Sequence, residues 1–260
     1  MMSVKNINEE NLLDVFRICS FNRLEDHTQL KGIQMKRSWL RYMMKKYGPC
    51  TKIAYVDTTP VAQILFYPEE AVPYIPLRRD GVIIMHCAYN PFVKFQRRGI
   101  ATALVGSLVN DSRMGLEILD GRLCEYIVTK PYIFSEGIAL DRLYSSLGFV
   151  DGFGEMYREI FGTYEPQELA RYTPLYEDRD RAVLLYEPLC EWNYVHMEQV
   201  KEVLQVIVPD LQVDIYNSWE HPDQSIRRGN QWLVVNSNPI KHYITDLEAF
   251  KKDVEEALTA

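Results

Sequence analysis

The spacing of apolar residues changes along this chain between a helical period and a strand period, and these changes outline its elements. In residues 9–21, Leu12, Val15, Phe16 and Cys19 recur at the intervals of one helix face. Residues 82–89 (VIIMHCAY) are instead apolar on both faces, which is typical of a strand inside a sheet. The first 160 residues predict a strand at 3–7, helices at 9–21 and 34–48, strands at 51–57, 61–69 and 82–89, a loop and helix at 95–109, a strand at 122–130, a helix at 139–149, and one or two short strands at 149–160.

A second pattern begins after residue 181. Residues 161–181 are rich in Pro, Tyr and charge, which predicts a linker or covering segment. The rest predicts the order β-α-β-(turn or helix)-β-β-α, with strands at 182–188 and 211–217, helices at 193–208 and 246–258, and a hairpin of 231–236 with 240–244 across Ser237, Asn238 and Pro239. We therefore expect a mixed α/β protein with one domain over residues 1–160, a linker over 161–181 and a smaller α/β domain over 182–260.

Composition and charge narrow the choice of partners. The 260 residues are 47% hydrophobic and 25% charged, which is enough to bury a core. Residues 161–260 hold 9 Lys and Arg against 18 Asp and Glu, whereas residues 1–160 hold 20 against 18, so the C-terminal part lacks the basic surface that nucleic acid requires. No apolar run approaches the about 18 residues of a membrane span, and residues 1–16 lack the basic start and apolar run of a secretion signal. We expect a cytoplasmic protein with no nucleic-acid or membrane partner.

The cysteines and histidines give no metal or disulfide pattern. The five cysteines lie far apart with no CxxC pair, and the five histidines show no HxxxH spacing: Cys19, Cys50, Cys87, Cys124, Cys190, His27, His86, His196, His221 and His242. Scattered cysteines of odd number are typical of reduced thiols in a reducing compartment. We therefore expect no bound metal.

Residues 95–109 (FQRRGIATALVGSLV) carry the clearest chemical signal. A strand that ends in a loop and enters a helix at Gly99 leaves unpaired backbone N–H groups at the helix N-terminus, where the helix dipole favours an anion such as phosphate. Glycine lets the main chain approach that anion closely, and Arg97 and Arg98 add positive charge. The stretch is not a P-loop, because GK[ST] is missing. A solvated basic loop is the alternative interpretation.

Two signatures together resemble the GNAT N-acetyltransferases. Their acetyl-CoA pyrophosphate motif [QR]-x-x-G-x-[GA] is matched by Gln96-Arg97-Arg98-Gly99-Ile100-Ala101, and the preceding strand ends in Cys87-Ala88-Tyr89-Asn90-Pro91. Their tyrosine-bearing helix with a glycine–aromatic turn is matched by Leu143-Tyr144-Ser145-Ser146-Leu147-Gly148-Phe149. The resemblance covers about residues 1–160 and implies a GNAT-type mixed sheet with flanking helices. It also implies acetyl-CoA as cosubstrate, held by Gln96 through Thr102, with the main chain at Cys87 and Tyr89 pairing with the pantetheine arm. Four residues separate Pro91 from Gln96, where the family commonly has about two, so the path of this loop is left open.

The resemblance also implies a catalytic tyrosine and leaves the base open. Tyr144 corresponds to the general acid that protonates the CoA sulfur. Strand 82–89 has no carboxylate, where family members often use Glu, so Glu125 on the neighbouring strand is our candidate base. His86 is the alternative, although strict alternation places it on the face opposite Cys87 and Tyr89. A water relay and an acyl-enzyme on Cys87 are further alternatives, but nothing near Cys87 in sequence lowers the pKa of its thiol.

The second domain resembles the thioredoxin-type fold in its element order. Its first strand runs into a turn with Cys190, but Asn193 stands where thioredoxins have the second cysteine of CxxC, which argues against dithiol exchange. We expect this domain to cover the acceptor side, bind substrate or mediate a homodimer. The predicted activity is acetyl transfer to a small-molecule or peptide amine of unknown identity, for which the acidic turn Glu25-Asp26-His27 would favour a cation. The alternatives are a CoA-binding module without turnover and a thiol-dependent protein acting through Cys190.

Overall fold

The computed structural model describes residues 1–131, 140–168 and 171–260. Two compact units divide the chain. The first comprises Met1–Leu24, Arg37–Val72 and Leu77–Gln167, and the second comprises Glu25–Lys36, Pro73–Pro76 and Glu168–Ala260. Of the sequence predictions, Ala139 in the helix at 139–149 and residues 169–170 of the linker lie outside the described residues. The division into independently folding domains at residues 160 and 182 remains a prediction.

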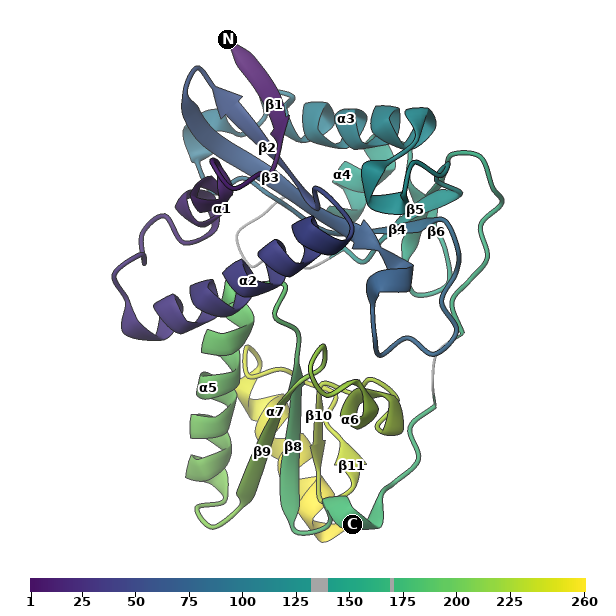
Figure 1. Ribbon diagram of the computed structural model, residues 1–260. Coiled ribbons are helices and arrows are strands. Elements are labelled where there is room, and N and C mark those ends of the chain that lie inside the picture. The colour runs from purple at the N-terminus through teal and green to yellow at the C-terminus, as the bar shows by residue number, and fades with distance from the viewer. Residues whose placement is uncertain (132–139, 169–170) are drawn as a thin grey trace. The chain divides into compact units, whose positions relative to one another are not determined.

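A mixed seven-stranded sheet forms the centre of the first unit (Figure 1). The strand order is β1-β2-β3-β4-β5-β7-β6, and β4 and β5 are parallel whereas the other pairs are antiparallel. The strands are β1 (Met2–Asn6), β2 (Thr51–Val56), β3 (Thr59–Pro68), β4 (Val82–Tyr89), β5 (Tyr126–Thr129), β6 (Val150–Asp151) and β7 (Met156–Glu159). The predicted mixed α/β class and the interior position of strand 82–89 are confirmed.

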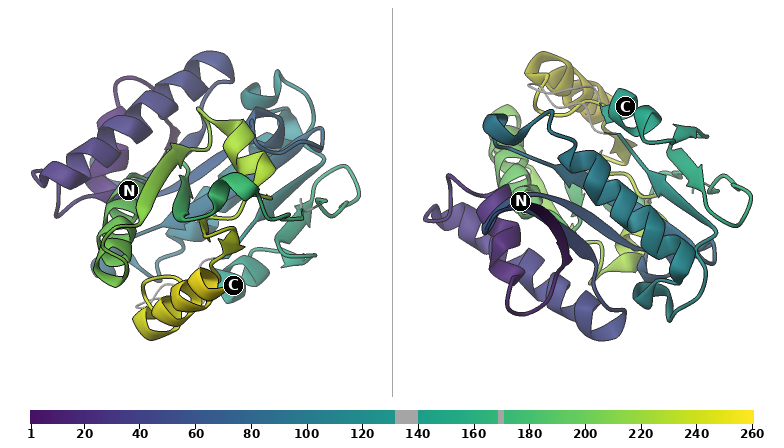
Figure 2. Two further views of the ribbon diagram at one scale, coloured as in Figure 1. Left: turned by 90° about the horizontal axis from the view of Figure 1, so that it is seen from below. Right: turned by 90° about the horizontal axis from the view of Figure 1, so that it is seen from above.

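Helices cover both faces of this sheet. The α-helices are α1 (Leu12–Cys19), α2 (His27–Lys46), α3 (Ile100–Met114) and α4 (Leu140–Ser146), with short 3-10 turns η1 (Glu69–Ala71), η2 (Val93–Phe95) and η3 (Glu117–Leu119). On one face, Cys19 of α1 accepts a hydrogen bond from Gln63 and Trp39 of α2 packs edge-on against Tyr67. On the other face lies α3 (Figure 2). Its Asp111 carboxylate meets the Lys52 ammonium at 2.5 Å.

Helix α2 begins seven residues earlier than the predicted 34–48, so that predicted start is wrong. The Asp26 side chain accepts a hydrogen bond from the Gln29 N–H at 2.9 Å, which caps the helix. Gly32 disfavours a helix by propensity, which hid this turn from the sequence pattern. A Cβ at Gly32 would lie 2.0 Å from the carbonyl oxygen of Glu191 in the same unit. Close approach of two backbones therefore requires glycine here.

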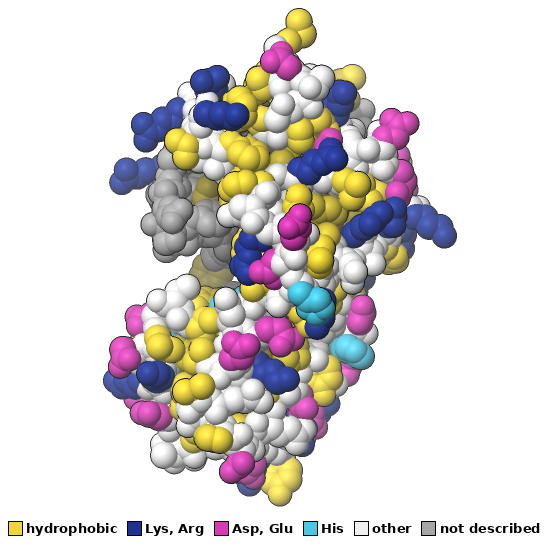
Figure 3. Space-filling view, turned by 90° about the vertical axis from the view of Figure 1, so that its left-hand side faces the viewer, with side chains coloured by type: hydrophobic (Ala, Val, Ile, Leu, Met, Phe, Trp, Pro, Cys, Tyr) yellow, Lys and Arg dark blue, Asp and Glu magenta, His cyan; other side chains and the backbone are white. Residues whose placement is uncertain are grey.

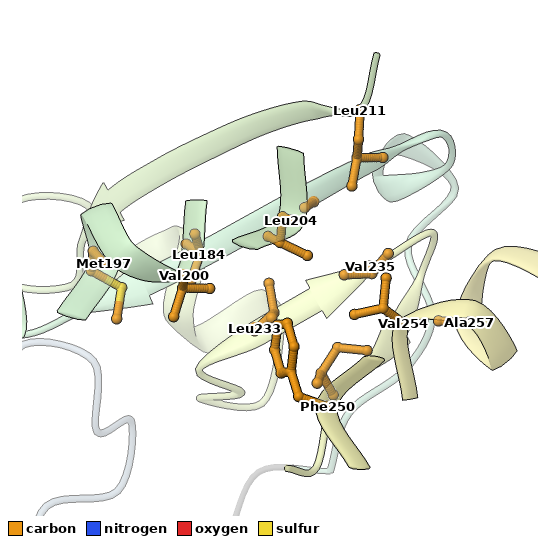
Figure 4. Close-up of a cluster of buried hydrophobic side chains, with 12 residues drawn as sticks. Leu184, Met197, Val200, Leu204, Leu211, Leu233, Val235, Phe250, Val254 and Ala257 are labelled. Carbon is orange, nitrogen blue, oxygen red and sulfur yellow. The ribbon is translucent and has the colours of Figure 1, made fainter. Parts of the chain in front are cut away.

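The second unit has a four-stranded sheet of order β11-β10-β8-β9, in which β8 and β9 are parallel and the other pairs antiparallel. Its elements are η4 (Tyr176–Asp178), β8 (Arg181–Tyr186), α5 (Glu191–Ile207), β9 (Gln212–Asn217), α6 (Pro222–Arg227), β10 (Leu233–Val235), β11 (Asn238–Pro239) and α7 (Leu247–Thr259). Side chains from α5, α7, β8 and β10 form its core (Figure 4). The predicted element order is confirmed, and the likeness to thioredoxin-type proteins remains a prediction.

Two predicted strands differ from the structure. The hairpin turns at Asn236 and Ser237, whose φ angles are +46° and +63°, so its second strand is Asn238–Pro239 and not 240–244. Paired positive φ values match the twist of a tight hairpin, and asparagine tolerates them. The strand predicted at 122–130 is reduced to Tyr126–Thr129, which leaves Glu125 outside it.

Charge is distributed over the surface in both signs. Acidic, basic and apolar side chains are interspersed on the face that Figure 3 shows. Among the helices of the described ranges, none combines the length and the apolar character needed to cross a bilayer.

A buried ion pair joins Arg228, the residue after α6, to η4 in the second unit, and it supplies a stability prediction. Arg228 and Asp178 are 3% and 0% exposed, and two hydrogen bonds of 2.9 and 2.6 Å join them. Replacing one partner leaves the other charge buried and unpaired, so Arg228→Met should lower the free energy of unfolding by about 3–5 kcal/mol. Urea unfolding of the full-length protein, followed by circular dichroism, measures this.

The next residue provides a matched control. Arg227 pairs with Glu177 at 2.7 Å, but both side chains are nearly half exposed. An exposed pair contributes at most about 1 kcal/mol, so Arg227→Met should change stability little. Equal effects of the two substitutions would contradict the importance assigned to the buried pair.

Candidate functional site

The loop between β4 and α3 is fixed by hydrogen bonds to Asn90. The Asn90 side chain accepts a hydrogen bond from the Phe92 N–H at 3.1 Å and donates one to the Phe95 carbonyl at 3.3 Å. The Gln96 side-chain amide donates to the Asn90 carbonyl at 3.1 Å. Gln96, the first residue of the predicted phosphate motif, therefore shapes the loop through its side chain. Three of the four residues before it, Val93–Phe95, form the turn η2.

Two residues of the predicted pyrophosphate-binding segment, Gln96 through Thr102, have left-handed backbone conformations. Arg97 has a φ of +57° and Gly99 a φ of +73°. An arginine in this region is strained by about 1–3 kcal/mol, and such strain concentrates at functional sites. The side of Gly99 where a Cβ would stand is open, with no described atom within 4 Å. The backbone of this loop is therefore accessible at the place where a ligand would approach it.

Helix α3 begins at this open position without a capping side chain. Gly99 occupies the N-cap position, and no side-chain hydrogen bond caps the helix among the described residues. The N–H groups of Ile100, Ala101 and Thr102 belong to the first turn, where a helix provides no internal acceptors. Two cations of the preceding loop, Lys94 and Arg98, pack on the ring of Phe95 at 4.8 and 5.8 Å. The backbone N–H donors, the helix dipole and these two positive charges together favour binding of an anion.

Strands β4 and β5 are paired along only part of β4, and the place beyond Ile84 and Val128 where this pairing stops is called the divergence. Their parallel register runs from Val82 opposite Tyr126 to Ile84 opposite Val128, and β4 continues from there to Tyr89. Cys87 and Tyr89 lie in this continuation, where β4 keeps its pairing with β3. Both predicted pantetheine-contacting residues therefore stand at the divergence and next to the loop that leads to α3.

Two buried hydroxyl groups meet at the divergence. Tyr144 of α4 is 0% exposed, and Thr129 at the end of β5 is 1% exposed. Neither hydroxyl has a hydrogen-bond partner of normal geometry within residues 1–131, 140–168 and 171–260. A buried hydroxyl left unsatisfied costs about 1–3 kcal/mol, which makes such groups rare without a functional reason.

The environment of Tyr144 keeps its hydroxyl protonated. Burial raises the pKa of Tyr144 to about 12, and the nearby Cys87 adds to this shift. The Thr129 hydroxyl and the Ala88 main chain lower the pKa in part, which shows that both lie close to the phenolic oxygen. The hydroxyl therefore stays protonated throughout the physiological pH range.

The structure does not bring Glu125 to this site. Glu125 is exposed and precedes β5, at the end where β4 and β5 are paired. Its N–H donates to the Gly81 carbonyl at 2.9 Å, and its carboxylate lies against Gly162. Tyr144 lies at the other end of β5, beside Thr129. The two predicted catalytic residues are thus separated by the length of the strand.

A β-bulge corrects the predicted orientation of His86. Leu65 pairs with Cys87 and Phe66 with Met85, so His86 is an extra residue in β4. The bulge interrupts the alternation that would place His86 opposite Cys87. The imidazole Nδ1 lies 3.4 Å from the hydroxyl of Tyr67.

Three residues of the site were not found from the sequence. Thr129, Tyr67 and Asn90 are brought to it by strand pairing or by the loop. Only Asn90 carried a local signal, as the first residue of an Asn-Pro turn. Among the described residues, no three His, Cys, Asp or Glu side chains form a group that could hold a metal ion.

Comparisons with known proteins give a partial structural similarity. No family model matches the sequence, and no curated protein matches it. Solved structures similar to this chain include Ard1 from Thermoplasma volcanium, at 11% identity and a TM-score of 0.41, covering 61% of this chain and 97% of that one. Another is a GNAT family acetyltransferase from Brucella melitensis in complex with acetyl-CoA, at 15% identity and a TM-score of 0.42, covering 64% and 92%.

A third is the ribosomal-protein-S18-alanine N-acetyltransferase from Escherichia coli, at 13% identity and a TM-score of 0.42, covering 64% of this chain and 97% of that one. Identities this low leave the activity of the present chain to be inferred from its own residues.

Proposed function

We propose that the protein is an acetyl-CoA-dependent N-acetyltransferase that acetylates a primary amine by direct attack. The observation that carries this proposal is the buried hydroxyl of Tyr144 at the divergence of β4 and β5, which has no partner of normal geometry in the described part of the chain. The same divergence leads through the Asn90 loop to the open N-terminus of α3. Strand β4 and the loop after it thus connect the proposed proton donor, Tyr144, with the proposed anion site at the N-terminus of α3.

The residues present fit acetyl-CoA. The first turn of α3, from Gly99 to Thr102, would bind the pyrophosphate through backbone N–H groups, with Arg97 and Arg98 adding charge. The continuation of β4 at Cys87 and Tyr89 would lie along the pantetheine arm. Bound there, acetyl-CoA supplies an acetyl group activated as a thioester.

Tyr144 would protonate the departing sulfur. Its hydroxyl is close to Cys87 and Ala88, and burial raises the pKa of the phenol still further above neutral pH. Burial also lowers the local dielectric, which strengthens the electrostatic interactions of this hydroxyl.

The acceptor is a small-molecule or peptide amine. The second unit contains the acidic turn at Glu25 and Asp26 as well as residues 168–260, and we assign it to acceptor recognition or to a homodimer. We place the protein in the cytoplasm.

Binding of acetyl-CoA should raise the melting temperature of the full-length protein. A ligand at a hundredfold excess over its Kd stabilises the folded state by about 2.7 kcal/mol. This corresponds to about 5–10 °C for a protein of this size. Differential scanning fluorimetry with acetyl-CoA measures the shift, and ATP at the same concentration is the control for adventitious anion binding. An equal shift with ATP would contradict the assignment.

Turnover separates an enzyme from a binding module. Release of free CoA thiol should accompany incubation with one or more members of a panel of alkylamines, methoxyamine, amino acids, polyamines and peptides with free N-termini. A melting shift without CoA release from any member would support a CoA-binding module instead. Loss of release in Cys190→Ser would support a thiol-dependent activity.

A further inference from the structure

We propose that His86 accepts the proton of the acceptor amine and that Tyr67 positions its imidazole. This inference rests on the proposed function and assigns the base that the sequence left open. It replaces Glu125, which lies at the paired end of β4 and β5.

The β-bulge places His86 at the start of the divergence. The parallel pairing of β4 with β5 ends at Ile84, and His86 is the extra residue that interrupts the β3 pairing two positions later. Bulges next to active sites re-aim a side chain without changing the course of the strand. The side chain of His86 is partly buried and therefore remains within reach of an acceptor.

Tyr67 fixes the ring of His86. Its side chain is 3% exposed and its ring packs edge-on against Trp39 at 5.8 Å, so its hydroxyl has little freedom. The 3.4 Å contact joins this hydroxyl to Nδ1. In the tautomer whose Nδ1–H donates to the Tyr67 oxygen, the lone pair is on Nε2, which is the form that a base requires.

The proposed acid, Tyr144, and the proposed base, His86, both lie at one short stretch of β4. The Tyr144 hydroxyl lies near Cys87 and Ala88, the two residues that follow His86. His86 contacts Tyr67 of β3, and Tyr144 belongs to α4. The attacking amine must lose a proton and the departing sulfur must gain one. His86 would serve the amine and Tyr144 the sulfur.

The transfer balances without another reactant. The amine nitrogen forms a bond to the acetyl carbon and the carbon–sulfur bond breaks. Nε2 of His86 takes the proton that the nitrogen loses, and Tyr144 gives its proton to the sulfur. Proton return from the imidazolium to the phenolate, directly or through solvent, restores both groups, and the products are an N-acetyl amine and CoA thiol.

The test compares His86→Gln with wild type on two acceptors. With the alkylamine that releases CoA fastest, kcat/KM should fall by about 10²–10⁴-fold, because an alkylamine is protonated at neutral pH and needs a base. With methoxyamine, which is already unprotonated, the loss should be much smaller. The shift in melting temperature with acetyl-CoA should match that of wild type and shows that the variant is folded.

Tyr67→Phe is a second, independent variant. It should show the same selective loss to a lesser degree, because the imidazole remains but loses its orienting partner. Tyr55→Phe is its matched control: Tyr55 is also buried, but its hydroxyl donates to Asp14 at 2.7 Å, away from β4. If His86→Gln does not fold, Tyr67→Phe against Tyr55→Phe decides the question.

The outcomes separate this inference from the proposed function. Wild type that releases no CoA with any amine contradicts the proposed function itself. Active wild type with an unchanged His86→Gln, or with equal losses for the alkylamine and methoxyamine, overturns the role of His86 and leaves acetyl transfer standing. A loss confined to Glu125→Gln overturns it in favour of Glu125.

Discussion

Tyr144→Phe should lower kcat by about 10²–10⁴-fold while leaving the affinity for acetyl-CoA nearly unchanged. The hydroxyl acts only as the sulfur leaves, so its loss affects the transition state and not ground-state binding. Because the pKa of Tyr144 is raised to about 12, wild type keeps this proton, and the ratio of the two rates should be constant between about pH 6 and 9. Steady-state CoA release and calorimetric titration measure the two quantities.

The same substitution should not destabilise the protein. The Tyr144 hydroxyl is buried without a partner of normal geometry in the described residues, so removing it relieves an unsatisfied group. We expect a melting temperature equal to or above that of wild type. Tyr126→Phe is the matched control: it is also buried, but its hydroxyl donates to the Glu165 carbonyl at 3.3 Å. It should keep its activity, and an equal kcat for Tyr144→Phe and wild type would show that the sulfur needs no help from Tyr144.

Gly99→Asp should reduce the affinity for acetyl-CoA by at least about 100-fold. A carboxylate at this position would face the proposed pyrophosphate across the open side of Gly99. Two like charges about 4 Å apart near a protein surface repel by about 4 kcal/mol, which exceeds the 2.7 kcal/mol of a hundredfold change. Loss of the acetyl-CoA-induced shift in melting temperature is the readout.

Gly154→Asp controls for backbone strain. Gly154 has a φ of +77°, close to the +73° of Gly99, and the position of its missing Cβ is equally open. Both variants therefore introduce the same charge at a left-handed position of the first unit. If Gly154→Asp binds acetyl-CoA with wild-type affinity and Gly99→Asp loses this affinity, the effect belongs to the predicted pyrophosphate-binding segment. Loss in both variants would point to general destabilisation.

Local periodicity predicted most of the fold, and its failures have physical causes. Apolar spacing located the interior strand β4 and the helix that follows Gly99, because both patterns depend on neighbours in sequence. It missed the first turns of α2 because Gly32 disfavours a helix, while the nearby Glu191 main chain requires glycine. Such close approaches depend on residues far away in the sequence.

The residues of the candidate site also fall into those that local sequence predicts and those that depend on distant pairing. Gln96 through Thr102 and Tyr144 belong to continuous motifs and could be proposed from the sequence. The positions of His86 and Tyr67 depend on a bulge between two strands, and register is set by pairing and not by either strand alone. Alternation therefore gave the wrong face for His86, and the separation of Glu125 from Tyr144 could not be foreseen.

The most direct test of acetyl transfer is a mass balance with acetyl-CoA carrying a ¹³C-labelled acetyl group. The full-length protein is incubated with this compound and the amine panel, and CoA thiol, N-acetyl product and intact protein are quantified by mass spectrometry. Acetyl transfer in one step predicts equal amounts of labelled N-acetyl amine and CoA, with no label on the protein. Acetate in place of N-acetyl amine, or label retained on Cys87, would contradict it.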